Sequence, residues 1–254
     1  MNALIKKIKQ KPELRNLSSK FIENSLKNYA EKYNITLEKL SPKEEKIVLK
    51  EIRASLRTLV GQYQKISKSR IFLLKENNFQ ELLKTHRSTE ERILFYPKLK
   101  KLLSSLKISS ILDLACGLNP IALASPKITY YASDINESEL SLINEFFKKH
   151  KIKGKTFIFD IRTLSQKSKL PKTDLTLILK TLDLLHPKQK LADNLLSIIN
   201  SKYFLISFPT KKLSGAPMKH KRRPWLERIL LQKNLKFRTF SSENEIFYLI
   251  TTQQ

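Results

Sequence analysis

The sequence feature that most constrains the fold is an apolar run that one glycine interrupts. Residues 111–124 read Ile-Leu-Asp-Leu-Ala-Cys-Gly-Leu-Asn-Pro-Ile-Ala-Leu-Ala. This pattern is typical of a buried parallel strand, a tight turn at Gly117, and a helix that carries Pro120 in its first turn. Such a turn directs backbone N–H groups and a helix N-terminus toward a ligand above the strand ends. Asp113, near the end of the strand, is therefore a candidate for binding a polar or cationic group.

A second carboxylate follows further along the chain. The next β-rich run, residues 128–134, ends at Asp134, where Rossmann-type sheets place an acid that accepts hydrogen bonds from ribose hydroxyl groups. The full Gly-x-Gly-x-x-Gly pattern is missing, because Asn119 and Pro120 stand where further glycines would be. A strand–glycine–helix turn occurs in many α/β folds, and an acid at a strand end often only caps a helix. The two carboxylates together favour a nucleoside-type ligand.

The two halves of the chain differ in periodicity. Residues 1–107 place apolar side chains at helical spacing, with no β-rich run and no aspartate. From residue 108 onward short β-rich runs alternate with helical ones, which indicates a mostly parallel sheet. The predicted strands cover residues 110–114, 128–133, 156–160, 174–180, 203–208, 235–240 and 246–251. The predicted helices of this half cover residues 120–124, 137–150, 188–199 and 223–233. We therefore expect a helical domain over 1–107 and an α/β domain over 108–254.

The charge balance indicates a polyanionic partner. The 254 residues carry 49 Lys and Arg against 23 Asp and Glu, a formal net charge of +26, and such a field attracts nucleic acid or an anionic membrane. The single cysteine, Cys116, excludes an intramolecular disulfide framework and a zinc ribbon. The sequence contains no apolar run of transmembrane length, and its first residues lack a signal-peptide pattern. We expect a soluble, cytoplasmic, monomeric protein without a metal site.

The end of the predicted sheet suggests a particular class of α/β protein. The last two predicted strands flank a short polar turn at residues 241–245 and are expected to form a hairpin. Seven strands that end in an antiparallel pair resemble the class I S-adenosylmethionine-dependent methyltransferases. That resemblance implies a Rossmann-like sheet behind the helical N-terminal domain, and S-adenosyl-L-methionine as the cofactor.

Three segments narrow the resemblance. They are Thr-His-Arg-Ser-Thr-Glu-Glu-Arg-Ile-Leu at residues 85–94, Asp-Leu-Ala-Cys-Gly-Leu-Asn-Pro at residues 113–120, and Leu-Ile-Ser-Phe-Pro-Thr-Lys-Lys-Leu-Ser-Gly at residues 205–215. Together with Leu179-Lys180, they resemble the aminoglycoside-resistance methyltransferases of 16S ribosomal RNA, which methylate N7 of a guanine in the decoding region. These enzymes usually continue Ser-Phe-Pro with Arg-Ser-Leu-Gly-Gly-Arg, and this chain departs from that pattern. The departure leaves the exact target nucleotide open.

The resemblance also assigns cofactor contacts by position. It implies that Asp134 holds the ribose hydroxyl groups and that Asp160 accepts a hydrogen bond from the adenine amine. Gly117 would let the backbone approach the methionine part, whose carboxylate would pair with Arg92 in a bidentate manner. The full set of implied cofactor contacts is His86, Arg92, Asp113, Ala115, Gly117, Asp134, Ile135, Asp160, Ile161 and Lys180.

A basic segment after the fifth predicted strand is the expected RNA-binding loop. Residues 211–223 contain six basic side chains and no acid, and such side chains neutralise phosphates and fix the orientation of the RNA. The expected RNA contacts are Lys211, Lys212, Met218, Lys219, Lys221, Arg222 and Arg223. Met218 or Trp225 could press against an extruded base. The alternatives are a solvated loop and a Trp225 that only anchors a helix.

The chemistry implied by the resemblance needs positioning rather than proton transfer. Guanine N7 carries a free lone pair, so its attack on the cofactor's methyl group requires no general base. We expect Lys180 and Ser207, at the ends of the fourth and fifth strands, to act as positioning residues. The expected function is N7-methylation of a guanine in 16S rRNA, within the small ribosomal subunit. Methylation of another rRNA site or of tRNA, and an inactive ribosome-binding homologue, are the alternatives.

Overall fold

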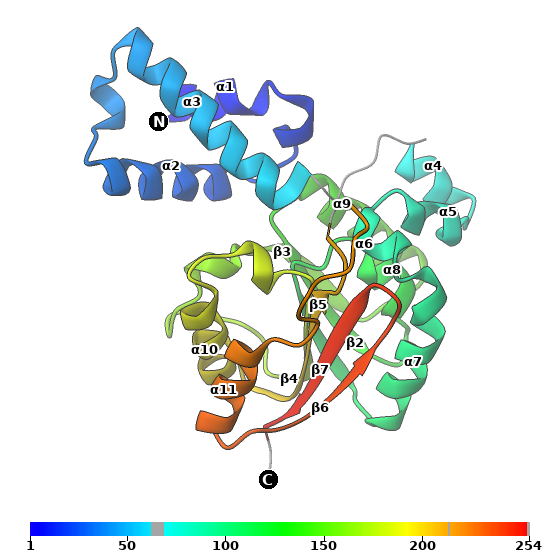
Figure 1. Cartoon of the computed structure of the whole chain (residues 1–254). Coiled ribbons are helices and arrows are strands. Elements are labelled where there is room, and N and C mark those ends of the chain that lie inside the picture. The colour runs from blue at the N-terminus through cyan, green and yellow to red at the C-terminus, as the bar shows by residue number, and fades with distance from the viewer. Residues whose placement is uncertain (62–68, 213, 253–254) are drawn as a thin grey trace.

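The computed structural model describes residues 1–61, 69–212 and 214–252. Within them, one seven-stranded sheet organises the second half of the chain (Figure 1). Its strands are β1 (Ser110–Leu114), β2 (Thr129–Asp134), β3 (Gly154–Ile158), β4 (Thr173–Leu179), β5 (Ser201–Pro209), β6 (Lys236–Ser241) and β7 (Glu245–Thr251). The strand order is β3-β2-β1-β4-β5-β7-β6. The first five strands are parallel, and β7 is antiparallel to both of its neighbours.

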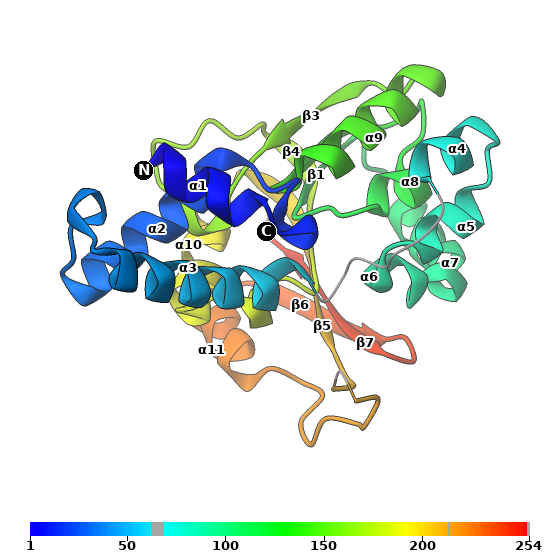
Figure 2. The ribbon, with the colours of Figure 1, turned by 90° about the horizontal axis from the view of Figure 1, so that it is seen from above.

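Helices cover both faces of the sheet, as Figure 2 shows from above. One face packs against α4 (Arg70–Lys75), α5 (Phe79–Lys84), α7 (Tyr96–Ser105), α8 (Asn119–Leu123) and α9 (Glu137–Lys149). The other face packs against α10 (Lys188–Ile198) and α11 (Pro224–Gln232). Strands buried on both faces are almost continuously apolar, and this explains β4 in the centre of the sheet, where Thr176 is the one polar residue between Leu175 and Leu179. Short helices α6 (Arg87–Glu90), η4 (Ile93–Phe95), η5 (Ile161–Thr163) and η6 (Leu182–Leu184) line the connections.

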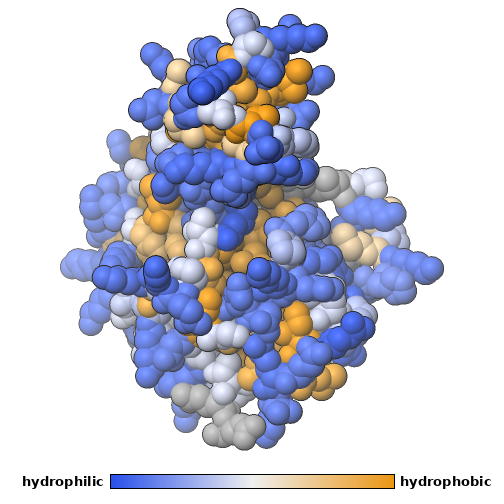
Figure 3. All heavy atoms as spheres, turned by 90° about the vertical axis from the view of Figure 1, so that its left-hand side faces the viewer, coloured by the Kyte–Doolittle hydropathy of each residue, from blue (hydrophilic) through white to orange (hydrophobic). Residues whose placement is uncertain are grey.

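The first sixty residues form a separate apolar cluster. It consists of α1 (Asn2–Lys9), η1 (Pro12–Leu14), α2 (Ser19–Tyr33), η2 (Leu37–Lys39), α3 (Pro42–Leu56) and the π-helical turn η3 (Arg57–Gly61). Ser41 and Glu44 form a reciprocal capping box at the start of α3, as the Ser-Pro-Lys-Glu sequence favours. Asn34 ends α2 in the left-handed conformation. Figure 3 shows this part at the top, where a group of hydrophobic residues lies among hydrophilic ones, and further hydrophobic residues are visible below it on the body of the molecule.

A short backbone connection joins this N-terminal cluster to the sheet. Leu17 and Asn136 form an isolated antiparallel bridge. The N–H of Ser18 donates to the carbonyl of Ile135 at 2.8 Å, and the N–H of Glu137 donates to the carbonyl of Asn16 at 2.8 Å. The connection reaches the loop directly after β2, so it fixes the N-terminal helices beside the carboxyl end of the sheet.

The predicted elements agree with the structure to within two residues at most boundaries. The seven strands, their final hairpin and the helices that follow β1, β2, β4 and β5 are confirmed. Strand β3 begins two residues earlier than predicted, because Gly154 pairs with Tyr130. Asp160 therefore lies beyond the strand, where it caps η5 through the N–H of Arg162. No helix in the described part of the chain is long and apolar enough to span a membrane.

Candidate functional site

A pocket with an empty volume of about 820 Å³ lies at the carboxyl ends of the parallel strands. The loops after β1, β2, β3 and β4 supply most of its wall, and the N-terminal helices and the start of α6 supply the rest: Phe21, Leu59, Val60, His86 and Ser88. Eight of the predicted cofactor contacts line it: His86, Ala115, Gly117, Asp134, Ile135, Asp160, Ile161 and Lys180. The structure thus brings together residues that lie far apart in the sequence.

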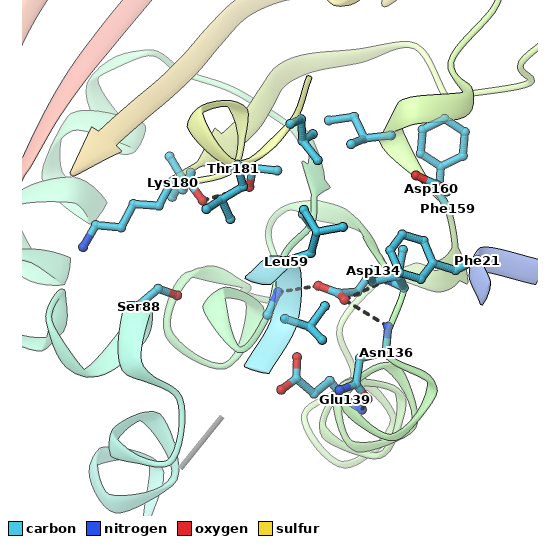
Figure 4. A pocket seen from close by; sticks show the side chains of 18 of the residues that line it. Phe21, Leu59, Ser88, Asp134, Asn136, Glu139, Phe159, Asp160, Lys180 and Thr181 are labelled. Atoms are coloured by element: carbon cyan, nitrogen blue, oxygen red, sulfur yellow. Dashed lines mark hydrogen bonds between the residues drawn. The ribbon is translucent and has the colours of Figure 1, made fainter. Parts of the chain in front are cut away.

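Asp134 occupies the middle of the pocket (Figure 4). Its Oδ2 accepts a hydrogen bond from the N–H of Gly117 at 3.0 Å, and its Oδ1 accepts from the N–H groups of Ile135 and Asn136 at 2.7 and 3.0 Å. Burial and the nearby charge of Glu139 raise the pKa of Asp134 to about 6, against the opposing effect of these N–H donors. The carboxylate is therefore oriented by backbone donors and ionised at neutral pH, as a ribose ligand requires.

Asp160 lies at one end of the pocket with Phe159. Its carboxylate accepts hydrogen bonds from Arg162 Nε at 2.9 Å and Nη2 at 2.8 Å. The guanidinium of Arg162 also lies 4.2 Å from the ring centroid of Phe21. Sequence reasoning missed this pairing, which ties the predicted adenine-binding acid to helix α2 and leaves apolar aromatic surface beside it.

Gly117 adopts the left-handed conformation, with φ +50°. A Cβ atom at this position would lie 3.0 Å from Cε1 of His86, so a side chain would crowd the imidazole. His86 Nδ1 lies 3.0 Å from the hydroxyl of Ser88. Burial, together with the positive charge of Arg70, lowers the pKa of His86 to about 3, so the ring is neutral at physiological pH. Gly117 and the neutral imidazole of His86 thus pack closely together and form an uncharged part of the pocket wall.

Two predicted cofactor contacts do not line the pocket. Asp113 is fully buried, and its Oδ2 accepts a hydrogen bond from the hydroxyl of Tyr130 at 2.7 Å. Burial raises the pKa of Asp113 to about 7, partly opposed by Tyr130 and by the charge of Arg92. The carboxylate of Asp113 thus joins β1 to β2 and does not line the pocket, and its expected contact with the ligand remains a prediction.

Arg92 is also fully buried, inside the protein rather than on the pocket wall. Its Nε donates to Glu245 Oε2 at 2.8 Å and its Nη1 donates to Asn119 Oδ1 at 2.7 Å. Nη2 has no hydrogen-bond partner in the described part of the chain. The expected pairing of Arg92 with a ligand carboxylate remains a prediction, which this unpaired donor supports.

Lys180 and Ser207 meet at the ends of β4 and β5. Lys180 follows β4 in a left-handed conformation, with φ +55°, and its Nζ donates to Glu91 Oε2 at 2.5 Å. Ser207 does not reach the pocket. Its hydroxyl donates to Glu245 and accepts from the N–H of Lys180 at 3.1 Å. Of the two predicted positioning residues, Lys180 therefore lines the pocket and Ser207 orients the Lys180 backbone.

The basic loop after β5 divides into two groups of side chains. Lys212, Lys219 and Lys221 are exposed, and Lys211 and Arg222 pair with Glu243 and Glu227 at 2.7 Å each. Lys211 is partly buried, and the other four side chains are exposed to solvent. Two hydrogen bonds between Lys212 and residues 215–216 fold the tip of the loop into a small turn.

Arg223 contradicts its expected role as an RNA contact. It is buried, and its Nη2 donates to Asp183 Oδ2 at 2.7 Å and to the carbonyl of Pro209 at 2.9 Å. Met218 is partly buried, and its sulfur lies 3.6 Å from Arg223 Nη2. Trp225 packs edge-on against Phe208 with ring centroids 5.8 Å apart, so it anchors α11. Through these contacts Arg223 and Trp225 stabilise the base of the loop.

Sequence reasoning missed two further residues of the site, Glu139 and Glu245. Glu139, in the first turn of α9, lines the pocket and pairs with Arg70 Nη1 at 3.0 Å. Glu245, at the start of β7, is 1% exposed at its side chain and joins Arg92 to Lys180. In the sequence, Glu245 is recognisable only as an acid directly before an apolar strand. Its partners, Arg92 and Lys180, lie in distant segments that no local pattern connects to it.

Comparison with known proteins supplies independent information. Residues 75–234 match the family model "Ribosomal RNA methyltransferase (FmrO)". A 16S rRNA (guanine(1405)-N(7))-methyltransferase of Serratia marcescens is 30% identical over 180 residues, 69% of each protein. The corresponding protein of Frankia casuarinae is 30% identical over 141 residues, 52% of this chain and 48% of the relative. The aligned part thus spans about half the length of such curated relatives.

Solved structures share the architecture of the whole chain. The 16S rRNA methyltransferase RmtF, in a crystal structure with S-adenosyl-L-homocysteine, superposes with a TM-score of 0.83. The alignment covers 99% of this chain and 98% of RmtF at 24% sequence identity. The similarity extends over the N-terminal helices as well as the sheet, and it establishes the fold.

Proposed function

Because this chain belongs to the ribosomal RNA methyltransferase (FmrO) family, we propose that it methylates N7 of a guanine in the decoding region of 16S rRNA, with S-adenosyl-L-methionine as the methyl donor. The observation that carries the proposal is the pocket at the carboxyl ends of β1 to β4, where Gly117, Asp134 and Asp160 converge. Its relatives in Serratia and Frankia are named for guanine 1405, which is the target that we propose here.

The residues of the pocket fit this cofactor. Asp134 presents a carboxylate for the ribose, and the absence of a Cβ at Gly117 lets the backbone approach the ligand. Phe21 and Phe159 provide apolar surface for a purine ring. Of the lining carboxylates, Asp160 pairs with Arg162 and Glu139 pairs with Arg70, whereas Asp134 accepts only backbone N–H groups and keeps its charge for the ligand. These features support the assignment of His86, Ala115, Ile135, Ile161 and Lys180 as further cofactor contacts.

The proposed chemistry relies on alignment. The cofactor, when bound, supplies a methyl group on a positively charged sulfur. Guanine N7 forms the new N–C bond with its lone pair while the C–S bond breaks, and no proton needs to be removed. Lys180 and Thr181 line the pocket directly after β4, and we propose that they position the target base. Ser207 contributes indirectly, since its hydroxyl accepts from the N–H of Lys180.

The charge distribution supports a ribosomal substrate. We propose that helices within residues 1–107 dock on the RNA and that residues 108–254 carry the methyl transfer. The exposed Lys212, Lys219 and Lys221 would contact phosphates beside the pocket. We propose that the protein acts as a monomer, in the cytoplasm where small ribosomal subunits are assembled.

The decisive test is methyl transfer from tritium-labelled S-adenosyl-L-methionine to purified small subunits, naked 16S rRNA and tRNA. The product is then mapped by borohydride–aniline cleavage, which cuts the chain at N7-methylguanine. Cleavage at a single decoding-region guanine is the expected result. Label without aniline cleavage would contradict N7 as the acceptor, and label on tRNA alone would contradict the ribosomal target. A protein that binds the cofactor but transfers no label to any of the three would contradict the proposed reaction.

A further inference from the structure

Buried and partly buried charges form a cluster at the end of the pocket that lies away from Asp160. Its members are Arg87, Glu91, Arg92, Lys180 and Glu245. The side chains of Arg92, Glu245 and Lys180 are 0%, 1% and 4% exposed. Figure 4 places Lys180 and Ser88 on one side of Asp134, with Phe159 and Asp160 on the other. The cluster therefore borders one specific part of the pocket.

Glu245 contacts two of the cations in this cluster. Its Oε2 lies 2.8 Å from Arg92 Nε and 3.6 Å from Lys180 Nζ. Its other oxygen accepts a hydrogen bond from the hydroxyl of Ser207. Glu91, the second carboxylate, binds Lys180 but also binds Arg87, at 3.0 Å. Glu245 is thus the carboxylate that joins Arg92 to Lys180, and its loss would leave this part of the wall with one more positive charge.

The charge of this wall affects the ligand that we propose. If Asp134 holds the ribose and Asp160 lies beside the adenine, the sulfur of the cofactor points toward the Lys180 end of the pocket. S-adenosyl-L-methionine carries a positive charge on this sulfur, and S-adenosyl-L-homocysteine does not. Two unbalanced cations in a buried wall would repel the first molecule more than the second, because charges interact strongly where water is excluded.

We propose that Glu245 is a positioning residue that sets the charge of the pocket: it offsets one of the two positive charges of Arg92 and Lys180, so that the sulfonium end of the cofactor can bind beside Lys180. This inference rests on the proposed function. This role differs from a general structural one, because it predicts that loss of the Glu245 charge changes the relative affinity for S-adenosyl-L-methionine and S-adenosyl-L-homocysteine. Both ligands share the adenosine and the methionine carboxylate, so damage to those subsites weakens both equally.

The test is isothermal titration calorimetry of both nucleosides with the wild-type protein and with Glu245→Gln. In Glu245→Gln, the affinity for S-adenosyl-L-methionine relative to that for S-adenosyl-L-homocysteine is expected to fall by at least about threefold, because the variant has one more positive charge near the sulfur. The matched control is Glu243→Gln, which makes the same change in net charge. Glu243 lies two residues earlier, 80% exposed and paired with Lys211, so its variant keeps the wild-type ratio. A ratio unchanged in both variants overturns the proposal.

Lys180→Gln provides a test with the opposite sign, and it replaces the first variant if Glu245→Gln does not fold. Removing this cation shifts the ratio toward S-adenosyl-L-methionine, while the double variant Lys180→Gln/Glu245→Gln returns it to within about twofold of wild type. Shifts of the same sign in the two single variants would show structural damage and overturn the proposal. Wild-type protein that binds neither nucleoside would instead contradict the proposed function, so the two failures are distinguishable.

Discussion

Replacing Asp134 by Asn removes one negative charge from the centre of the pocket and preserves the shape of the side chain. In the wild-type protein the carboxylate accepts three backbone hydrogen bonds, from Gly117, Ile135 and Asn136. The amide has one oxygen, so its NH₂ group faces either the N–H of Gly117 or those of the other two residues. At least one backbone donor then loses its acceptor.

The effect on stability is the difference between two opposing quantities. The pKa of Asp134 rises from 3.8 to about 6, first because of burial and then because of Glu139. This rise means that the ionised group destabilises the fold by about 3 kcal/mol at pH 8, and the substitution removes that penalty. A buried N–H without an acceptor costs about 1–3 kcal/mol. We therefore expect the free energy of unfolding to change by less than about 2 kcal/mol.

The effect on ligand binding is one-sided. Hydrogen bonds to a charged group contribute about 1.5–3 kcal/mol each, so losing one raises the dissociation constant of the cofactor by about 10- to 100-fold. The same loss occurs in the wild-type protein when Asp134 is protonated, so its cofactor affinity falls as the pH drops below about 6. The affinity of Asp134→Asn for the cofactor is low both above and below pH 6.

Calorimetric titration with the cofactor at pH 8 and pH 5, together with urea unfolding at the same pH values, measures both quantities. The expected result is a variant that is about as stable as the wild type and binds poorly. Wild-type affinity in Asp134→Asn would refute the role of this carboxylate. A loss of more than about 3 kcal/mol in unfolding free energy would refute the assignment of a destabilising charge.

Three other substitutions test different parts of the structure. Gly154→Ala places a Cβ 1.9 Å from the carbonyl oxygen of Tyr130, so we expect a loss of more than about 3 kcal/mol; thermal unfolding of soluble protein measures it, and a wild-type melting temperature would contradict the β2–β3 register. Burial raises the pKa of Asp113 from 3.8 to about 7. Its contribution to stability is thus complete below pH 3.8 and lost as the pH rises through 7, so urea unfolding should show Asp113→Asn more stable relative to wild type at pH 8 than at pH 5, by about 2–3 kcal/mol; a difference independent of pH would refute this. Replacing Lys212, Lys219 and Lys221 together by Gln should weaken small-subunit binding and lower the dependence of log K on log salt by about 2, measured by filter binding at several salt concentrations; an unchanged slope would show that the loop does not contact phosphates.

Local patterns predicted most of the fold. The Gly117 loop, the alternation of strands and helices after residue 108, and the Ser41–Glu44 cap depend on neighbours in the sequence, and the structure contains each of them. Strand β3 was placed two residues late, because the start of that strand depends on pairing with Tyr130 rather than on its own composition. Boundaries that another segment determines are the ones that periodicity misses.

The candidate site was predicted less completely. Acids and glycine at strand ends converge on the pocket because parallel strands share one carboxyl edge. Three other predicted site residues do not line the pocket, because each is buried with a partner that lies 17 to 153 positions away in the sequence. These pairs are Arg92 with Glu245, Asp113 with Tyr130, and Arg223 with Asp183. A charged residue can therefore belong to a functional motif without facing the pocket. Only the folded chain shows which charges face the ligand and which are paired behind it.

The contribution of the N-terminal helices to the pocket has a consequence for inhibitor design. Phe21, Leu59 and Val60 line the pocket, yet they precede the segment that matches the family model, residues 75–234. A competitive nucleoside analogue that contacts only the Gly117 loop and Asp134 would meet the surface that many methyltransferases present to the same cofactor. An extension that reaches Phe21 and Leu59 would gain its selectivity over other methyltransferases from a wall that lies outside the segment matching the family model.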